Sequence, residues 1–343
     1  MKKYIIPLAC ILLAGCTQDN SLNSGETARE YLKLWMQHWN ADNGKNVTQD
    51  ASGIYILEDI PGTGALWTPD SVYTYGRVTV KSLSGKITTT DNEDLAKQLG
   101  TYVANGYYGP SFFGTGEGVS YAGVDATLKG MRMGGTRTVV IPAWLITTSR
   151  YDTEEEYIDA CSSTSNLIYT LSPVSQTSSV ERIEKEMLAE YIAGKYPGLK
   201  STSYDSETEA DGTFFIKYLN DTTKLTRHAK DTTVALSYTG HRLDGTVFDT
   251  TDEKTAKDAG IYDSSRTYGS YSVKFSTDWN SISLDGSTSL INGFKGGLSL
   301  MDYWGQKAVI MFTSSHGYAA TGKGSSIPAY TPLVFEMDLS TKK

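Results

Sequence analysis

Two segments of the chain carry apolar residues at helical spacing. Residues 26–41 and 179–195 each repeat such residues every three or four positions, which predicts two amphipathic helices. The apolar face of the first consists of Tyr31, Leu32, Trp35 and Trp39. The face of the second consists of Ile183, Met187, Leu188 and Tyr191. Ser179 is the predicted cap of the second helix, and Gly194 with Pro197 marks its predicted end. Both faces are interpreted as packing surfaces.

Each predicted helix is followed by a β-rich stretch that opens in the same way. SGIYILEDIPGTG (52–64) and DGTFFIKYLNDTT (211–223) both give a glycine, an aromatic-rich strand and turn residues. Later in each stretch a Met-x-x-Gly signal recurs, with one extra residue in the second copy. Its residues are Met131 and Gly134, then Met301 and Gly305. The pattern predicts an α+β protein that repeats a helix and a β-domain.

The predicted boundaries follow from these signals. We expect a signal peptide at 1–15, a lipidated tether and helix at 16–49, and a first β-domain at 50–173. A helix and linker at 174–208 then lead to a second β-domain at 209–343. The linker ends in a polar, acidic stretch, and this composition favours a connection over a packed element.

The amino-terminal segment MKKYIIPLACILLAGC combines two lysines with a short apolar run. The run is too short to span a bilayer, which needs about 20 apolar residues, and it has the length of a signal-peptide core. Leu13-Ala14-Gly15-Cys16 resembles a bacterial lipobox, so we expect Cys16 to carry lipid after residues 1–15 are removed. The alternative is an ordinary signal peptide followed by a chance cysteine. The expected location is the bacterial envelope, at the outer membrane, on its periplasmic face or the cell surface.

Composition excludes several function classes. The chain has 39 acidic and 31 basic residues and a net charge of −8, which disfavours nucleic-acid binding. Three cysteines and four scattered histidines fit neither a disulfide framework nor a zinc-finger framework. Residues 317–323 nearly match a phosphate-binding loop, but Gly324 stands where Ser or Thr is required, and Pro328 follows too soon for a helix. We therefore expect no nucleotide, cofactor or metal.

An ordered set of short motifs covers residues 231–339. They are Tyr238-Thr239-Gly240, Asp244-Gly245, Phe248-Asp249, Leu290-Ile291-Asn292-Gly293-Phe294, Gly317-Tyr318, Ile327-Pro328 and Leu333-Val334-Phe335. In this order the set resembles the FKBP-type peptidyl-prolyl cis-trans isomerases. The resemblance implies a half-wrapped antiparallel sheet around one short helix that begins near Gly293. It also implies a proline-binding pocket between helix and sheet, and proline-containing polypeptides as clients.

The resemblance also assigns individual residues to the pocket. The positions implied for catalysis are Tyr238, Phe248, Asp249, Ile291, Phe294, Tyr318, Ile327 and Phe335. Leu290, Lys323 and Ser326 fall at substrate-binding positions. Three positions depart from the usual pattern: Phe294 replaces the Trp floor, Lys323 a frequent His, and Ser326 one of two adjacent Ile. The candidates for a further pocket aromatic position are Tyr271, Phe275 and Ile282. Asp249 has two readings, a carboxylate that orders the neighbouring loop and one that faces the pocket.

The first β-domain follows the same plan with fewer of these residues. Val124 stands at the position of the floor aromatic, and residues 87–90 replace the Phe-Asp pair. No Tyr-Gly or Ile-Pro loop follows Pro142. We expect this domain to keep the fold without catalysis, and to hold clients, orient the second domain or act as a spacer. For the whole chain the alternatives to an isomerase are a non-catalytic peptide-binding protein and a structural surface lipoprotein. The sequence leaves the oligomeric state open.

Overall fold

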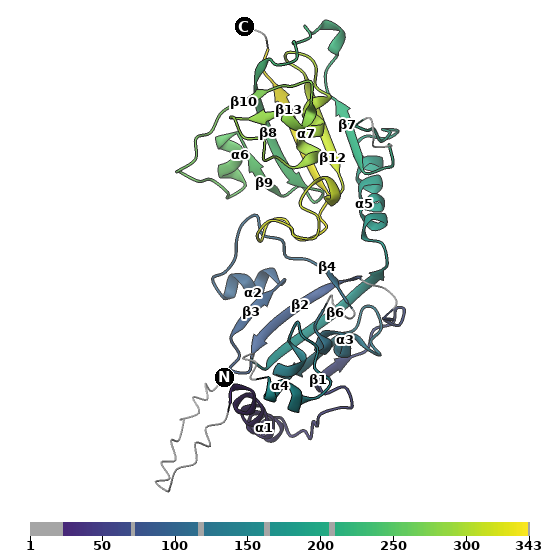
Figure 1. Ribbon diagram of the computed structural model, residues 1–343, viewed down its shortest axis with the longest axis vertical. Helices are drawn as coiled ribbons and strands as arrows, with labels where there is room; N and C mark the ends of the chain where they lie inside the picture. Colours follow the sequence, from purple (N-terminus) through teal and green to yellow (C-terminus); the bar gives the residue numbers. More distant parts are fainter. Residues whose placement is uncertain (1–22, 70–72, 116–119, 161–164, 206–209, 342–343) are drawn as a thin grey trace.

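The computed structural model describes residues 23–69, 73–115, 120–160, 165–205 and 210–341. Within these ranges the chain forms two α+β domains, each an antiparallel sheet with a short helix on one face (Figure 1). The predicted fold class is confirmed. Cys16 and the predicted signal peptide lie outside the described residues.

The second domain contains the longer sheet. Its strands are β7 (Phe214–Tyr218), β8 (Thr233–Arg242), β9 (Val247–Thr250), β10 (Tyr271–Lys274), β11 (Ser283–Leu284), β12 (Lys307–Phe312) and β13 (Leu333–Leu339). They run in the order β11-β10-β8-β13-β12-β7, and β9 pairs with β8 beside this path. All pairings are antiparallel. The sheet brings the middle of β8 and β13, which are distant in sequence, directly side by side.

Helix α7 (Asn292–Ser299) packs on the inner face of this sheet at very short range. A Cβ atom on Gly293 would lie 2.6 Å from the Phe312 ring, and one on Gly297 would lie 2.6 Å from Ile310 Cδ1. Neither glycine has a positive φ, so close approach to the sheet explains the absence of a side chain at both positions. The helix starts where the sequence predicted it, one residue before Gly293.

The first domain repeats this architecture. Its strands are β1 (Tyr55–Ile60), β2 (Tyr73–Ser82), β3 (Ile87–Thr90), β4 (Ser111–Gly114), β5 (Thr136–Ile141) and β6 (Leu167–Thr177), in the order β1-β5-β6-β2-β3 with β4 on β2. Helix α3 (Ala122–Leu128) takes the place of α7. A Cβ on Gly123 would lie 2.1 Å from Ile141, as one on Gly293 would meet Phe312. The two domains are therefore structural copies, and strand register aligns them residue by residue.

The two long helices cover the outer faces of the two sheets. In α1 (Ser24–Asn43), Leu32 and Met36 are buried together with Leu57, Val140 and Ile168. In α5 (Val180–Lys195), Leu188 and Ile192 pack on Phe215, Val309, Met311 and Val334. The predicted apolar face of the first helix is confirmed for Leu32, Trp35 and Trp39, which all pack in this cluster. Tyr31 was wrongly included, because it is 45% exposed, and the buried Met36 was missed. The predicted Ser179 cap is present, because its side chain accepts a hydrogen bond from the Arg182 backbone.

A short helix and a tyrosine-paired loop, neither of them predicted, follow β3 and β9. Helices α2 (Glu93–Gln98) and α6 (Glu253–Asp258) are each followed by two stacked tyrosines. The ring centroids of Tyr102 and Tyr108 are 5.6 Å apart, and those of Tyr262 and Tyr268 are 5.4 Å apart. In both loops the second tyrosine hydroxyl accepts a hydrogen bond from a backbone N–H five residues earlier. In the second domain this loop carries Arg266, which binds Asp249, whereas in the first domain it donates a hydrogen bond to the Ser325 carbonyl of the second domain.

Among the described residues, no helix combines the length and the apolar character that a membrane crossing requires.

Replacing Leu188 by Ala should destabilise the second domain. Leu188 is fully buried between α5 and the sheet, so the substitution removes apolar contacts and leaves a cavity. The expected loss in the free energy of unfolding is about 2–5 kcal/mol. Urea denaturation measures it, with Leu34→Ala as the control because Leu34 is 55% exposed on α1. An equal effect of the two substitutions would contradict the assigned packing.

His316 should make the stability of the second domain depend on pH. Its Nδ1 lies 2.7 Å from the Tyr204 hydroxyl, and its Nε2 lies 2.9 Å from Thr213 Oγ1. Burial lowers the pKa of His316 below its ordinary value of 6.5, although Asp211 and Glu181 oppose the shift. The unfolded chain therefore binds this proton first, and stability should fall as pH drops below about 6.5.

The test compares urea denaturation of the wild type and His316→Gln at pH 7.5 and 5.5. The variant should lose part of the pH dependence, whereas His38→Gln, at an exposed position on α1, should retain it. A pH dependence that is unchanged in His316→Gln would show that His316 does not cause it.

Candidate functional site

The residues predicted to form the pocket meet in one place. Tyr238, Phe294, Ile327 and Phe335 are buried in a single apolar cluster of the second domain. Phe248, Leu290, Ile291 and Tyr318 pack against this cluster and are only partly buried. The elements that supply them are β8, β9, β13, the start of α7 and the loop between β12 and β13. An apolar surface between helix and sheet is therefore assembled from segments that are distant in the sequence.

Phe294 occupies the centre of the cluster. Its ring is nearly perpendicular to those of Tyr238 and Phe335, at centroid distances of 5.2 and 5.1 Å. Phe248 meets Phe335 edge to face at 5.5 Å. Such edge-to-face pairs fix ring orientation beyond what burial alone provides. Phe294 thus lies at the base of the site, where the resemblance implied a Trp.

Gly240 creates the space in which two of these rings lie. A Cβ at this position would come within 2.7 Å of both the Phe248 and the Phe335 rings. Gly240 is paired with Phe335 across β8 and β13, and with Asp249 across β8 and β9. The Tyr-Thr-Gly motif therefore contributes a tyrosine and an opening for its neighbours.

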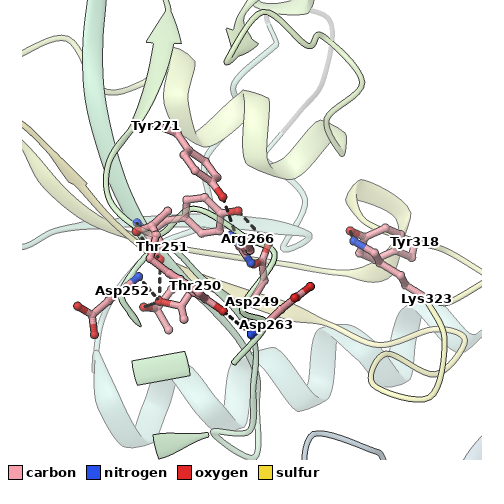
Figure 2. A network of polar contacts seen from close by, with 12 residues as sticks. Asp249, Thr250, Thr251, Asp252, Asp263, Arg266, Tyr271, Tyr318 and Lys323 are labelled. Carbon is pink, nitrogen blue, oxygen red and sulfur yellow. Dashed lines mark hydrogen bonds and ion pairs between the residues drawn. The ribbon is translucent and has the colours of Figure 1, made fainter. Parts of the chain in front are cut away.

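Asp249 joins the pocket to the loop after α6. The Tyr238 hydroxyl donates to one carboxylate oxygen at 2.8 Å, and Arg266 Nη1 donates to the other at 2.5 Å. Arg266 Nε also donates to the Tyr271 hydroxyl at 2.9 Å. Figure 2 shows Arg266 between Asp249 and Tyr271. The carboxylate orders the neighbouring loop and borders the aromatic cluster at the same time, so the two readings of Asp249 are compatible.

This network fixes protonation at the site. Burial, together with the negative charge of Asp249 and the hydrogen bond to it, raises the pKa of Tyr238 well above its usual range. Tyr238 consequently stays protonated at neutral pH and donates to Asp249. Both oxygens of Asp249 accept hydrogen bonds, so the pair is suited to shaping a surface rather than to moving protons.

The loop after β12 carries Tyr318 and Lys323, which Figure 2 shows apart from the Asp249 network. Lys323 Nζ donates to the Tyr318 hydroxyl at 3.2 Å and lies 5.3 Å from the centroid of that ring. The backbone N–H of Lys323 donates to the carbonyl of Ile327 at 2.7 Å, which holds buried Ile327 toward the cluster. Lys323 is exposed and Ser326 half-buried. The Ser326 carbonyl faces Arg242.

The structure distinguishes the three candidates for a further pocket aromatic residue. Tyr271 contacts Tyr238 with ring centroids 6.2 Å apart and accepts a hydrogen bond from Arg266. Phe275 packs on His228 in the core, and Ile282 is fully buried. Arg266 was missed by sequence reasoning. The two copies of the tyrosine-paired loop can be aligned on their tyrosines, and Arg266 then stands opposite Gly106. This charged difference between the copies is the signal that could have pointed to Arg266.

The first domain has an open cavity where the second has its aromatic cluster. The cavity measures about 420 Å³, and its walls include Val78, Phe113, Tyr121, Val124 and Tyr169. Strand register places Val78 at the position of Tyr238 and Tyr169 at that of Phe335. Burial raises the pKa of Tyr169 to about 12, so its hydroxyl stays neutral. Smaller side chains at the equivalent positions leave the space that Phe294 and Tyr238 fill in the second domain.

No protein-family model matches the chain, and no curated protein sequence matches it. One similar solved structure is a peptidyl-prolyl cis-trans isomerase from Pseudomonas syringae pv. tomato. It is 22% identical, covers 47% of this chain and 92% of that one, and has a TM-score of 0.32.

A second similar structure contains the three FKBP domains of wheat FKBP73. It is 13% identical, covers 87% of this chain and 98% of that one, and has a TM-score of 0.29. Similarity at this level carries no argument about activity. The fold is assigned from the strand order and the helices. Each domain wraps an antiparallel sheet on a short helix, which is the FKBP-like arrangement that the sequence motifs imply.

Proposed function

We propose that the second domain is a peptidyl-prolyl cis-trans isomerase that assists protein folding. One observation carries the proposal: eight of the eleven predicted pocket residues converge on one apolar cluster, and Asp249 links that cluster to the adjoining loop. An X–Pro bond is the substrate that fits such a surface, because its rotation breaks no covalent bond and requires no acid, base or metal.

The geometry fits the physical demands of this reaction. Resonance in the planar amide creates a barrier of about 18–20 kcal/mol, and unaided X–Pro exchange takes roughly 10–100 s. Water stabilises the polar planar state more than the twisted one. A proline ring placed against the partly buried Phe248, Ile291 and Tyr318, above the buried Phe294, would leave water and favour the twisted state. Each tenfold acceleration requires about 1.4 kcal/mol of such differential stabilisation.

The polar network supports this surface without taking part in the chemistry. Asp249 holds the Tyr238 ring and the Arg266 loop in fixed positions. A preorganised wall keeps the substrate in one orientation, which lowers the entropy cost of reaching the transition state.

Anchorage in the envelope is the second part of the proposal. The lipobox-like sequence before Cys16 supports a lipid on this cysteine, and the polar segment Thr17-Gln18-Asp19-Asn20-Ser21 after it would serve as a tether. Acylation by more than one chain makes a stable membrane anchor. The clients would be proline-containing polypeptides at the outer membrane, on its periplasmic or outer face.

A non-catalytic, peptide-holding function is the second candidate, and the first domain favours it. Its cavity of about 420 Å³ offers an apolar surface with Tyr121 and Tyr169 in its wall. It lacks the Tyr–Asp–Arg network, because Val78, Thr89 and Gly106 occupy the corresponding positions. Such a site could hold an extended apolar segment without promoting rotation.

Replacing Phe248 by Ala should lower isomerase activity while leaving the domain folded. Phe248 is only partly buried and forms one wall of the pocket, so its loss exposes the substrate ring to water. We expect kcat/KM for a peptide with an apolar residue before proline to fall at least about tenfold. A protease-free assay, such as exchange spectroscopy by NMR, measures it.

Tyr218→Ala is the matched control, because Tyr218 is 41% exposed on edge strand β7, away from the pocket. It should retain wild-type activity. A folded Phe248→Ala variant with full activity would show that the pocket is misassigned.

Replacing Cys16 by Ser should release the protein from the membrane. Serine cannot form the thioether that would carry the lipid, and the short apolar run of the signal sequence cannot serve as a membrane span. Fractionation and detergent-phase partitioning of cells that express each form measure the effect. Equal partitioning of both forms into the detergent phase would contradict lipidation at Cys16.

A further inference from the structure

The loop that forms one wall of the pocket also contacts the first domain. It runs from Tyr318 to Tyr330 and contributes Tyr318 and Ile327 to the cluster. Its base is closed by a hydrogen bond from the Tyr330 backbone to the Ala319 carbonyl at 2.8 Å. At its outer end, the Ser325 carbonyl accepts a hydrogen bond from the Tyr107 backbone of the first domain at 2.8 Å. In Figure 1 the yellow loop faces the first domain.

Arg242 is the central residue of this contact. It ends β8 and is only 4% exposed. Its Nη1 donates to the Ser326 carbonyl at 2.6 Å and to the Asn105 carbonyl at 3.0 Å. Asp244 balances its charge at 3.2 Å. One buried guanidinium therefore joins the pocket loop to a loop of the other domain: Nη1 donates to both carbonyls, while Nε donates to Asp244 and Nη2 to the Gly106 carbonyl.

The first domain presents residues 103–108, here called the strap, to this arginine. The Arg242 guanidinium carbon lies 5.2 Å from the Tyr107 ring centroid. The strap is the part of the first domain's tyrosine-paired loop that follows Tyr102. In the second domain the corresponding loop directs Arg266 to Asp249, whereas the strap has Gly106 at that position. The loop at 262–268 thus contacts the pocket through Asp249, and the strap contacts the pocket loop through Arg242 and Ser325.

Tyr330 makes a second contact between the domains. Its ring lies 5.4 Å from Tyr73 and 6.2 Å from Phe112, both in the first domain. Its backbone has φ 57°, a left-handed conformation that side-chain-bearing residues seldom adopt. Beside it the domains leave a cavity of about 410 Å³, so the interface is not continuously packed. The few contacts at Arg242, the strap and Tyr330 therefore have to fix the loop.

We propose that Arg242 is a positioning residue for the isomerase site, and that the strap of the first domain holds the pocket loop in its working conformation. As far as activity is concerned, this inference rests on the proposed function. It assigns the first domain a role as part of the site's scaffold, beyond a spacer. A loop that is free to move would have to be ordered at each binding event, and small displacements of positioning groups cost large factors in rate.

The test uses the full chain and the Arg242→Gln substitution, with Arg227→Gln as the matched control. Arg227 is an exposed arginine of the same domain that pairs with Asp302, away from the interface. Two quantities are measured: kcat/KM on an X–Pro peptide, and backbone hydrogen exchange of residues 318–330 and of the strap. The melting temperature checks that each variant is folded.

In Arg242→Gln we expect kcat/KM to fall at least tenfold and exchange to rise in both loops, with β8 and β13 still protected. Arg242→Lys, which keeps the charge but not the fork, should recover only part of the activity. Arg227→Gln should match the wild type. Unchanged exchange in residues 318–330 of folded Arg242→Gln would overturn the inference.

Tyr107→Ala provides an independent variant if Arg242→Gln fails to fold. The Tyr107 ring of the strap lies 5.2 Å from the Arg242 guanidinium carbon, and its removal leaves the sequence of the second domain unchanged. Exchange in residues 318–330 should rise, and unchanged exchange there would contradict the proposal. If the wild type has no isomerase activity, the proposed function fails, and the exchange measurements still decide whether the strap holds the loop.

Discussion

The close approach of α7 to its sheet is the constraint on which the candidate site depends. Gly293 and Gly297 let the helix lie where any side chain would collide with Phe312 or Ile310. That approach places Phe294 against Tyr238 and Phe335 and creates one apolar surface from helix and sheet. Glycine in a helix costs about 1 kcal/mol relative to alanine. The cost is offset by the burial of Phe294 and Leu298 against the sheet.

Comparison of the two domains shows how one architecture acquires different surfaces. Both keep the strand order, the short helix and the tyrosine-paired loop. In the second domain, Gly240 admits two phenylalanine rings, whereas Val80 occupies the corresponding position in the first. The first domain therefore has a cavity and the second an aromatic cluster because a few side chains differ in size on the same backbone arrangement.

Much of the fold could be predicted from the sequence because local patterns specify it. Apolar residues at alternating positions predicted the central strand β8, and the glycines near residue 293 predicted the short helix. The ordered motifs predicted which residues meet at the pocket. The first helix was less well predicted, because aromatic residues such as Tyr31 fit a helical stripe without being buried. Arg266 and Arg242 were missed for another reason. Their partners lie in loops, and in the case of Arg242 in another domain, so no periodicity marks them.

The aromatic cluster of the second domain is proposed to accelerate rotation about X–Pro bonds. The most direct measurement is the cis/trans exchange rate of an X–Pro peptide, by NMR exchange spectroscopy, with and without catalytic amounts of the full chain from residue 16. We expect exchange well above the uncatalysed rate, in proportion to protein concentration, and loss of the acceleration when Phe248 is replaced. An exchange rate equal to that of the peptide alone, with a folded protein, would show that the cluster does not catalyse the rotation.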